Sequence, residues 1–246
     1  MKRSIITVII GIAVVFVTLG CNLIDTITSA VTSKLTEELG NIQVTTEPEV
    51  VVVPYGGEEL PTQTVDYLLY DDFSDPQSGW EIYEGEYGTA GYRDGGYLVE
   101  AVEESQYMWG VAGKTFTDVQ IDVDATVLET VEAGNDAYGV DCRVQANGDG
   151  YGFRISSDGW VAINKYVDME SVALVEWIQS DAIFMNGVNH LTAICNGNQL
   201  TFLVNGQEVA QVTDDTYTSG DIALSAVGLA AGKISVLFDN ILVQNP

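Results

Sequence analysis

From Val65 to the C-terminus, apolar and polar residues alternate with a period of two, the period of a β-strand with one buried face. The segment DVQIDVDATV at 118–127 is the clearest case, because every second residue is apolar and the residues between are polar. The segments YGVDCRV at 138–144 and KISVLFDNILV at 233–243 alternate over most of their length. No long helical pattern follows residue 65, so the alternation predicts an all-β domain.

Tight-turn residues divide this region into short strands. Asn205-Gly206 lies between two alternating runs, and Asn196-Gly197 and Asp158-Gly159 repeat the arrangement. Such pairs favour two-residue hairpin turns, and strands that recur every 8 to 12 residues or so are typical of a sandwich or a barrel. Because residues 65–246 exceed the roughly 100 residues of an immunoglobulin-type sandwich, we expect one large two-sheet antiparallel jelly-roll domain there.

The N-terminus has the features of an export signal. Lys2 and Arg3 precede an apolar stretch from Ile5 to Leu19. That stretch is shorter than the roughly 20 residues that a membrane-spanning helix needs, and it fits the core of a signal peptide. We therefore expect an exported protein.

Small Gly20 stands directly before Cys21, and here the chain resembles a bacterial lipoprotein. The leucine that such signals carry three residues before the cysteine is displaced to Leu19, with Thr18 in its usual place. The resemblance implies a signal peptide at 1–20 and an acylated Cys21 at the extracytoplasmic face of the cell membrane. More than one acyl chain on Cys21 is enough for stable anchoring. An uncleaved short anchor or a simple secretory signal are the alternatives.

Residues 21–64 differ in composition from the domain that follows. They are rich in Thr and Glu and hold three of the five prolines. This composition predicts a flexible stalk. The formal net charge of the whole chain is −27, which repels nucleic acid and anionic lipid headgroups, so we expect no nucleic-acid partner and membrane contact through the lipid anchor alone.

Two cysteines, Cys142 and Cys195, remain after Cys21. In an oxidising compartment an even remainder favours a disulfide, and a loop of this length would be stabilised by about 4 kcal/mol on the chain-entropy model. Two separate buried thiols are the alternative.

Several motifs occur in a familiar order. They are YDDFSDPQSGW, YRDGGYLVEA, YGVDCRVQANGDGYGFRISSDGWVAINKY, NHLTAICNGNQLTFLVNGQEVAQVTD and the closing VLFDNILV. Together they resemble the concanavalin A-like jelly rolls, and most of all the laminin-G-like and 3-keto-disaccharide hydrolase-like domains, from about Asp66 to Pro246. The resemblance implies two curved antiparallel sheets, often with a carbohydrate site on the concave sheet and a structural calcium ion.

The sequence contains no complete motif for glycoside hydrolysis or for a zinc site. The segment DVDATVLE is the nearest match to the Glu-x-Asp-x-(x)-Glu motif of family 16 glycoside hydrolases, with Asp122 and Asp124 in the first two places and no carboxylate in the third. Glycoside hydrolysis needs two carboxyl groups at a set separation, so these two aspartates are better read as a solvated strand face. His190 is the only histidine and has no companion for a zinc site. We therefore assign no catalytic residue.

A carbohydrate site would need aromatic platforms beside planar hydrogen-bonding groups. Arg143 faces away from the cysteine side of its strand, and Arg154 faces away from Phe153 and Ile155, so the two arginines could line one sheet face. The candidate carbohydrate-binding residues are Arg143, Arg154, Trp109, Tyr151, Trp160 and Tyr166. The alternative is that the arginines pair with surface acids and the aromatic residues belong to the core.

Calcium is the candidate cofactor. In related jelly rolls an aspartate of the last strand and oxygens near the first strand hold one ion, and Asp239, Asp72 and Asp71 match these places. Turn hydrogen bonding by these carboxylates is the alternative.

Taken together, the sequence predicts a surface-anchored lipoprotein that presents a non-catalytic carbohydrate-binding or adhesion domain. One alternative is a glycoside hydrolase or 3-keto-disaccharide hydrolase relative acting on extracellular polysaccharide. The other is a structural protein-interaction module.

Overall fold

The computed structural model describes residues 67–131, 134, 136–168, 170–229 and 232–246. The predicted signal peptide, Cys21 and the stalk to residue 64 lie outside this part of the chain. The described residues form fifteen strands and contain no helix. Accordingly, none of the described segments is a helix that could cross a membrane.

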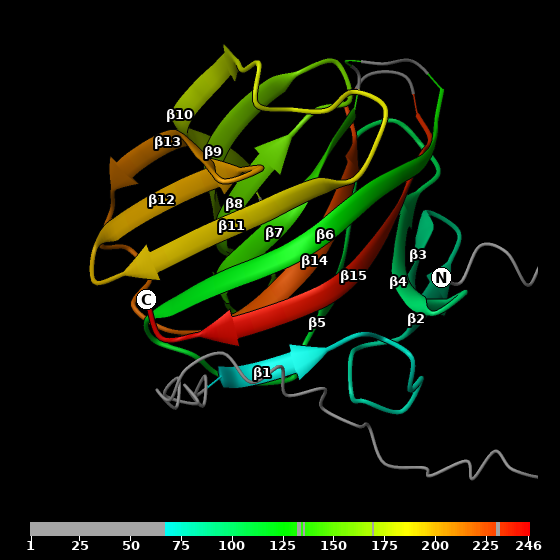
Figure 1. The fold of residues 1–246 in the computed structure, drawn as a ribbon, viewed down its shortest axis with the longest axis horizontal. Coiled ribbons are helices and arrows are strands. Elements are labelled where there is room, and N and C mark those ends of the chain that lie inside the picture. Colours follow the sequence, from blue (N-terminus) through cyan, green and yellow to red (C-terminus); the bar gives the residue numbers. More distant parts are fainter. Residues whose placement is uncertain (1–66, 132–133, 135, 169, 230–231) are drawn as a thin grey trace, which may run out of the picture. The chain divides into compact units, whose positions relative to one another are not determined.

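The strands form two antiparallel sheets that lie one behind the other in Figure 1. The nine-stranded sheet has the order β13 (Gln207–Thr213), β12 (Gln199–Val204), β11 (Asn189–Asn196), β6 (Val119–Thr130), β15 (Ile234–Gln244), β4 (Gly96–Ala101), β3 (Gly88–Arg93) and β2 (Tyr83–Gly85), and β1 (Tyr67–Asp71) also pairs with β15. The six-stranded sheet has the order β10 (Glu170–Gln179), β9 (Trp160–Val167), β8 (Gly150–Ile155), β7 (Asp136–Val144), β14 (Asp221–Gly228) and β5 (Gln106–Val111). The predicted two-sheet sandwich is therefore confirmed.

The hairpin corners have the backbone geometry that their residues favour. Asn205 and Gly206 join β12 to β13 with φ angles of 52° and 78°. Two consecutive positive φ angles define a type I′ turn, which matches the twist of the flanking strands and which Asn-Gly adopts with little strain. The pair Asp94-Gly95, with φ angles of 54° and 82°, makes the same turn between β3 and β4.

The core fills the space between the sheets. In β6, Val119, Ile121, Val123 and Ala125 are all buried, as the alternation predicts. Cys142 of β7 and Cys195 of β11 are joined by a disulfide, which links the six-stranded sheet to the nine-stranded sheet through this core.

The same alternation also builds the outer face of the six-stranded sheet. In β9, Val161 and Ile163 are buried in the core. Residues of opposite parity, Trp160, Asn164 and Tyr166, therefore point away from the core. This outer face carries the candidate site.

Candidate functional site

Two tyrosines meet over the outer face of the six-stranded sheet. Tyr107 belongs to β5 and Tyr166 to β9, and β8, β7 and β14 lie between these strands. In a flat sheet the two strands would be roughly 19 Å apart, farther than two tyrosine side chains can bridge. The rings nevertheless stack, with centroids 4.9 Å apart and planes at 4°. The sheet must therefore curve so that its outer face is concave at this place.

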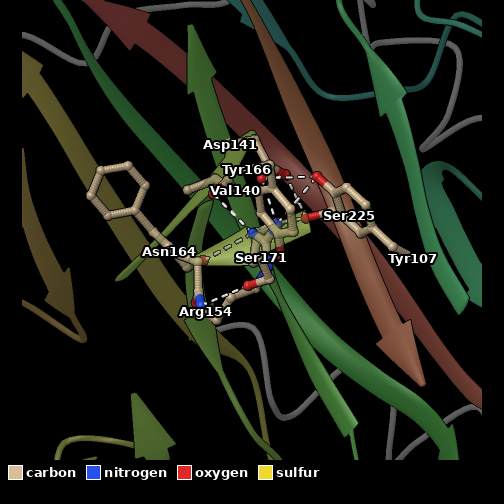
Figure 2. A network of polar contacts seen from close by, with 10 residues as sticks. Tyr107, Val140, Asp141, Arg154, Asn164, Tyr166, Ser171 and Ser225 are labelled. Carbon is tan, nitrogen blue, oxygen red and sulfur yellow. Dashed lines mark hydrogen bonds and ion pairs between the residues drawn. The ribbon is translucent and has the colours of Figure 1, made fainter. Parts of the chain in front are cut away.

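Arg154 of β8 lies under the two rings and is 1% exposed. Its guanidinium carbon is 5.4 Å from the centroid of the Tyr107 ring and 5.6 Å from that of Tyr166, the geometry of a double cation–π contact. Its Nη1 donates to the carbonyl of Val140 at 3.2 Å (Figure 2).

Asp141 of β7 neutralises the buried guanidinium. Its Oδ1 lies 2.5 Å from Nη2 of Arg154 and accepts a hydrogen bond from the Tyr107 hydroxyl at 3.0 Å. Its Oδ2 accepts a hydrogen bond from the Ser225 hydroxyl at 2.6 Å (Figure 2). Both carboxylate oxygens are therefore engaged within the network.

A glycine beneath the ion pair makes this arrangement possible. A Cβ atom at Gly152 would lie 2.6 Å from Nη2 of Arg154 and 3.0 Å from Oδ1 of Asp141. Both distances are shorter than ordinary contacts, so the pair can lie flat against the sheet only where β8 carries no side chain.

Burial and charge fix the protonation of the network. Burial raises the pKa of Tyr107 well above its usual value, and the neighbouring Asp141 raises it further. Burial alone would lower the pKa of Arg154, but the Asp141 carboxylate outweighs it and raises that pKa well above the usual value. The network therefore holds a protonated tyrosine and one compensated ion pair, with no net charge.

A central hollow with a volume of about 460 Å³ opens beside this network. Aromatic rings form part of its wall and polar groups the rest, and its lining includes Tyr107, Arg154, Asn164, Tyr166, Ser171 and Trp177. Asn164 donates a hydrogen bond to the Ser171 hydroxyl at 3.0 Å, which orders one polar edge (Figure 2). The Nε atom of Arg154 is buried and finds no hydrogen-bond partner among the described residues.

Two more hollows lie on the same face. A smaller one of about 290 Å³, the tryptophan hollow, is lined by Gly134, Ser156, Asp158, Trp160, Trp177 and Leu229. It shares Trp177 and Leu229 with the central hollow, so the two are adjacent.

The third, the acidic hollow, has a volume of about 510 Å³, and its lining includes Glu81, Trp109 and Asp221. The Trp109 ring stacks on Tyr107 with centroids 4.8 Å apart. Burial raises the pKa of Asp221, backbone N–H groups including those of Ile222 and Lys114 oppose this rise, and Glu81 adds to it.

Four of the predicted carbohydrate-binding residues lie on this outer face: Trp109, Arg154, Trp160 and Tyr166. Tyr151 does not. It is fully buried on the core side of β8, and its hydroxyl donates to Asp214 at 2.7 Å. For Tyr151, the alternative that the aromatic residue belongs to the core is therefore correct.

Arg143 is also elsewhere, so the expectation that it shares a face with Arg154 is wrong. Arg143 has a φ of 55°, and the pairing of β7 with β14 shifts register beside it, so a bulge interrupts the alternation. Its buried guanidinium donates to the carbonyls of Thr117 and Tyr217 and pairs with Asp118 at 3.0 Å.

The six candidate carbohydrate-binding residues chosen from the sequence do not include Tyr107, Asp141 or Trp177. Tyr107 has the same strand parity as Trp109, so the period of β5 could have placed it on the outer face. Trp177 has the same parity along β10 as Ser171, which lines the same hollow, although two register shifts interrupt the alternation between Ala173 and Ile178. No pattern in the sequence marks Asp141 as the partner of Arg154.

The three predicted calcium ligands are engaged in local hydrogen bonds. Asp71 accepts from the N–H of Phe73 and from the Ser78 hydroxyl, and Asp239 accepts from the N–H of Asn240. Asp72 accepts from both the N–H and the hydroxyl of Ser74. Among the described residues, no group of three or more acidic, His or Cys side chains is arranged to hold a metal. The carboxylates thus fit turn chemistry better than an ion site, and calcium binding stays a prediction.

The hydrolase-like aspartates lie on the other side of the sandwich. Asp122 and Asp124 project from the outer face of the nine-stranded sheet beside His190 of β11. Nδ1 of His190 is 2.8 Å from Asp124, and Nε2 is 3.7 Å from Asp122. These carboxylates do not face any of the three hollows.

A family model matches residues 72–244, which is most of the chain and almost all of the described part. The family is described as the 3-keto-alpha-glucoside-1,2-lyase-like domain. The chain belongs to this family. Among curated protein sequences, no significant match to the chain is found.

Several solved structures share the two-sheet sandwich fold of this member of the 3-keto-alpha-glucoside-1,2-lyase-like family. The carbohydrate-binding module CBM66 from Bacillus subtilis is similar with a TM-score of 0.57 and 15% identity, over 68% of this chain and 96% of the module. A β-glucanase from Bacillus licheniformis has a TM-score of 0.54 and 13% identity, over 75% of this chain and 100% of the enzyme. At such identities the likeness shows the fold, which both binding modules and glycoside hydrolases use.

Proposed function

We propose that this protein binds a neutral glycan without catalysis, in the central hollow on the concave face of the six-stranded sheet. The observation that carries the proposal is the wall of that hollow. Tyr107, Tyr166 and Trp177 supply aromatic surface, while Asn164 and Ser171 supply an ordered polar edge. Sugar rings present apolar C–H faces and a rim of hydroxyl groups, so they need both kinds of surface in one shallow site.

The electrostatics of the site favour a neutral ligand. The charge of Arg154 is compensated by Asp141 at 2.5 Å and is covered by two tyrosine rings. The chain carries a formal net charge of −27, so an anionic glycan would approach against a repulsive field. Arg154 suggests either a neutral or an acidic sugar as the ligand. We therefore favour the neutral sugar.

The placement of the carboxylates supports binding without glycoside hydrolysis in this hollow. Glycoside hydrolysis uses two carboxyl groups that flank the scissile bond. No carboxylate is among the described residues that line the central hollow, and the nearest one, Asp141, has both oxygens engaged. A sugar in this hollow would thus be held by hydroxyl, amide and ring contacts.

A second candidate function is catalysis in the acidic hollow. The family description names a lyase, and Glu81 and Asp221 line that hollow beside Trp109. The raised pKa of Asp221 suits a general acid, although the N–H groups of Ile222 and Lys114 occupy its oxygens. Turnover of a 3-ketoglycoside that Asp221→Asn abolishes would favour this candidate over pure binding.

The cellular setting belongs to the proposal as well. An acylated Cys21 after an N-terminal signal would hold the domain at the outer face of the cell membrane, on a stalk of about forty residues. Metabolic labelling with a clickable fatty acid tests this: wild type should take up label and Cys21→Ala should not.

Affinity electrophoresis tests the binding itself. The full-length protein in detergent is run through gels that contain a neutral β-glucan, α-glucan or fructan, or an acidic polysaccharide. We expect retardation by at least one neutral polymer, and its loss in Trp177→Ala. Tyr70→Ala is the matched control, because Tyr70 is an exposed aromatic residue of β1 in the other sheet. Unchanged migration in every neutral gel would overturn the proposal.

A further inference from the structure

The tryptophan hollow has the features of a second sugar site. Trp160 begins β9 and is 38% exposed. Trp177 of β10 lines the same hollow. The hollow therefore presents two indole rings from neighbouring strands.

The polar rim of this hollow is held in place. Ser156 donates a hydrogen bond to Oδ1 of Asp158 at 2.5 Å and accepts one from the N–H of Trp160 at 3.0 Å. Gly134 stands against the same carboxylate with a φ of 87°, and a Cβ atom there would lie 2.4 Å from Oδ2 of Asp158. An acceptor for sugar hydroxyl groups is thus ordered beside the indole rings.

The tryptophan hollow adjoins the central hollow. Trp177 and Leu229 line both, so the two hollows lie next to each other at these residues. The volumes, about 290 and 460 Å³, are near and within the range of roughly 300–1,000 Å³ that small-molecule sites occupy. Each hollow alone suits one or two sugar rings, and the pair suits a chain.

We propose that the tryptophan hollow is a second sugar subsite, so that the ligand is a neutral oligosaccharide that spans both hollows. This inference rests on the proposed binding at the central hollow. Trp160 provides the platform of the second subsite, Asp158 accepts hydroxyl hydrogen bonds there, and Trp177 contacts the sugars on both sides. Affinity should consequently depend on chain length.

Calorimetric titration with sugars of defined length tests the subsite. The full-length protein in detergent is titrated with mono-, di- and tetrasaccharides of mixed-linkage β-glucan, α-1,4-glucan and fructan. For the backbone that binds, the tetrasaccharide should bind about tenfold more tightly than the monosaccharide, because a second ring stacks. Trp160→Ala should remove that gain. Trp177→Ala should weaken both.

The outcomes separate the two proposals. If no sugar of any length binds, the proposed function fails and the second subsite falls with it. If sugars bind with the same affinity at every length, or Trp160→Ala retains the gain with length, the second subsite is refuted while binding at the central hollow stands. Tyr70→Ala should match wild type throughout.

Discussion

The rings of Tyr107 and Tyr166 stack with centroids 4.9 Å apart, although three strands lie between β5 and β9 in their sheet. This contact closes the concave face over Arg154 and makes the guanidinium one of the most buried large side chains of the domain. The wall of the central hollow and the burial of its ion pair thus have the same origin, the curvature of one sheet.

Loss of the Asp141 charge should destabilise the fold strongly. In Asp141→Asn the buried Arg154 keeps its charge but has no counterion, and breaking a buried pair on one side costs about 3–5 kcal/mol. Urea unfolding followed by tryptophan fluorescence measures the change. The control is Glu129→Gln, which removes an exposed partner of Lys233 and should shift the midpoint little. Equal midpoints for the two variants would contradict the assigned role of Asp141.

A methyl group at position 152 should disturb the same network from below. In Gly152→Ala the new Cβ atom would lie 2.6 Å from Nη2 of Arg154, so the ion pair must shift. Overpacking of this kind costs about 1–3 kcal/mol, and the displaced arginine should also weaken glycan binding. Thermal melting and affinity electrophoresis measure the two effects.

The matched control for this change is Gly91→Ala. Gly91 is also a strand glycine, and a Cβ atom there would meet only ordinary contact, with Ile82 at 3.6 Å. Its melting temperature should stay close to that of wild type. A Gly152→Ala protein as stable as Gly91→Ala would show that the network tolerates the displacement.

His190 should make stability depend on pH. Contacts with the carboxylates of Asp122 and Asp124 raise its pKa to about 9 from a usual value of 6.5, so the folded state favours the protonated ring. The stabilisation is fully present below about pH 6.5 and is lost as the pH rises through 9. Because the ring is half exposed, the effect should be less than about 1 kcal/mol.

Unfolding midpoints between pH 6 and pH 10 test this dependence. Wild type should lose stability over that range by more than His190→Gln does, and an NMR titration of the ring should give a midpoint above 8. Parallel profiles for the two proteins would rule out the ion pairs as a source of stability.

The sequence predicts the architecture well because period two and turn chemistry are local signals. The alternation of β6 and the Asn205-Gly206 corner each depend on a few adjacent residues, and the structure has both as expected. The candidate site depends on long-range geometry instead. Asp141 and Arg154 meet because β7 pairs with β8 above Gly152, and Tyr107 reaches Tyr166 because the sheet curves.

Arg143 also shows that local sequence signals do not fix the position of a side chain. Its parity along β7 puts it on the outer face, but one bulge with a φ of 55° redirects the side chain toward Thr117 and Tyr217. A bulge depends on what the partner strand accepts, so alternation within a single strand cannot reveal it.

Removal of the disulfide should test how far the two sheets depend on a covalent link. Cys142 and Cys195 are 53 residues apart in sequence, and a loop of that length gives about 4 kcal/mol of stabilisation through the unfolded state. We expect Cys142→Ala/Cys195→Ala to unfold at clearly lower urea than the oxidised wild type, with an unchanged β-sheet circular-dichroism spectrum. Wild type reduced with dithiothreitol should approach the double variant. If oxidised and reduced wild type unfold at the same urea concentration, the cross-link contributes nothing and packing between the sheets alone holds them together.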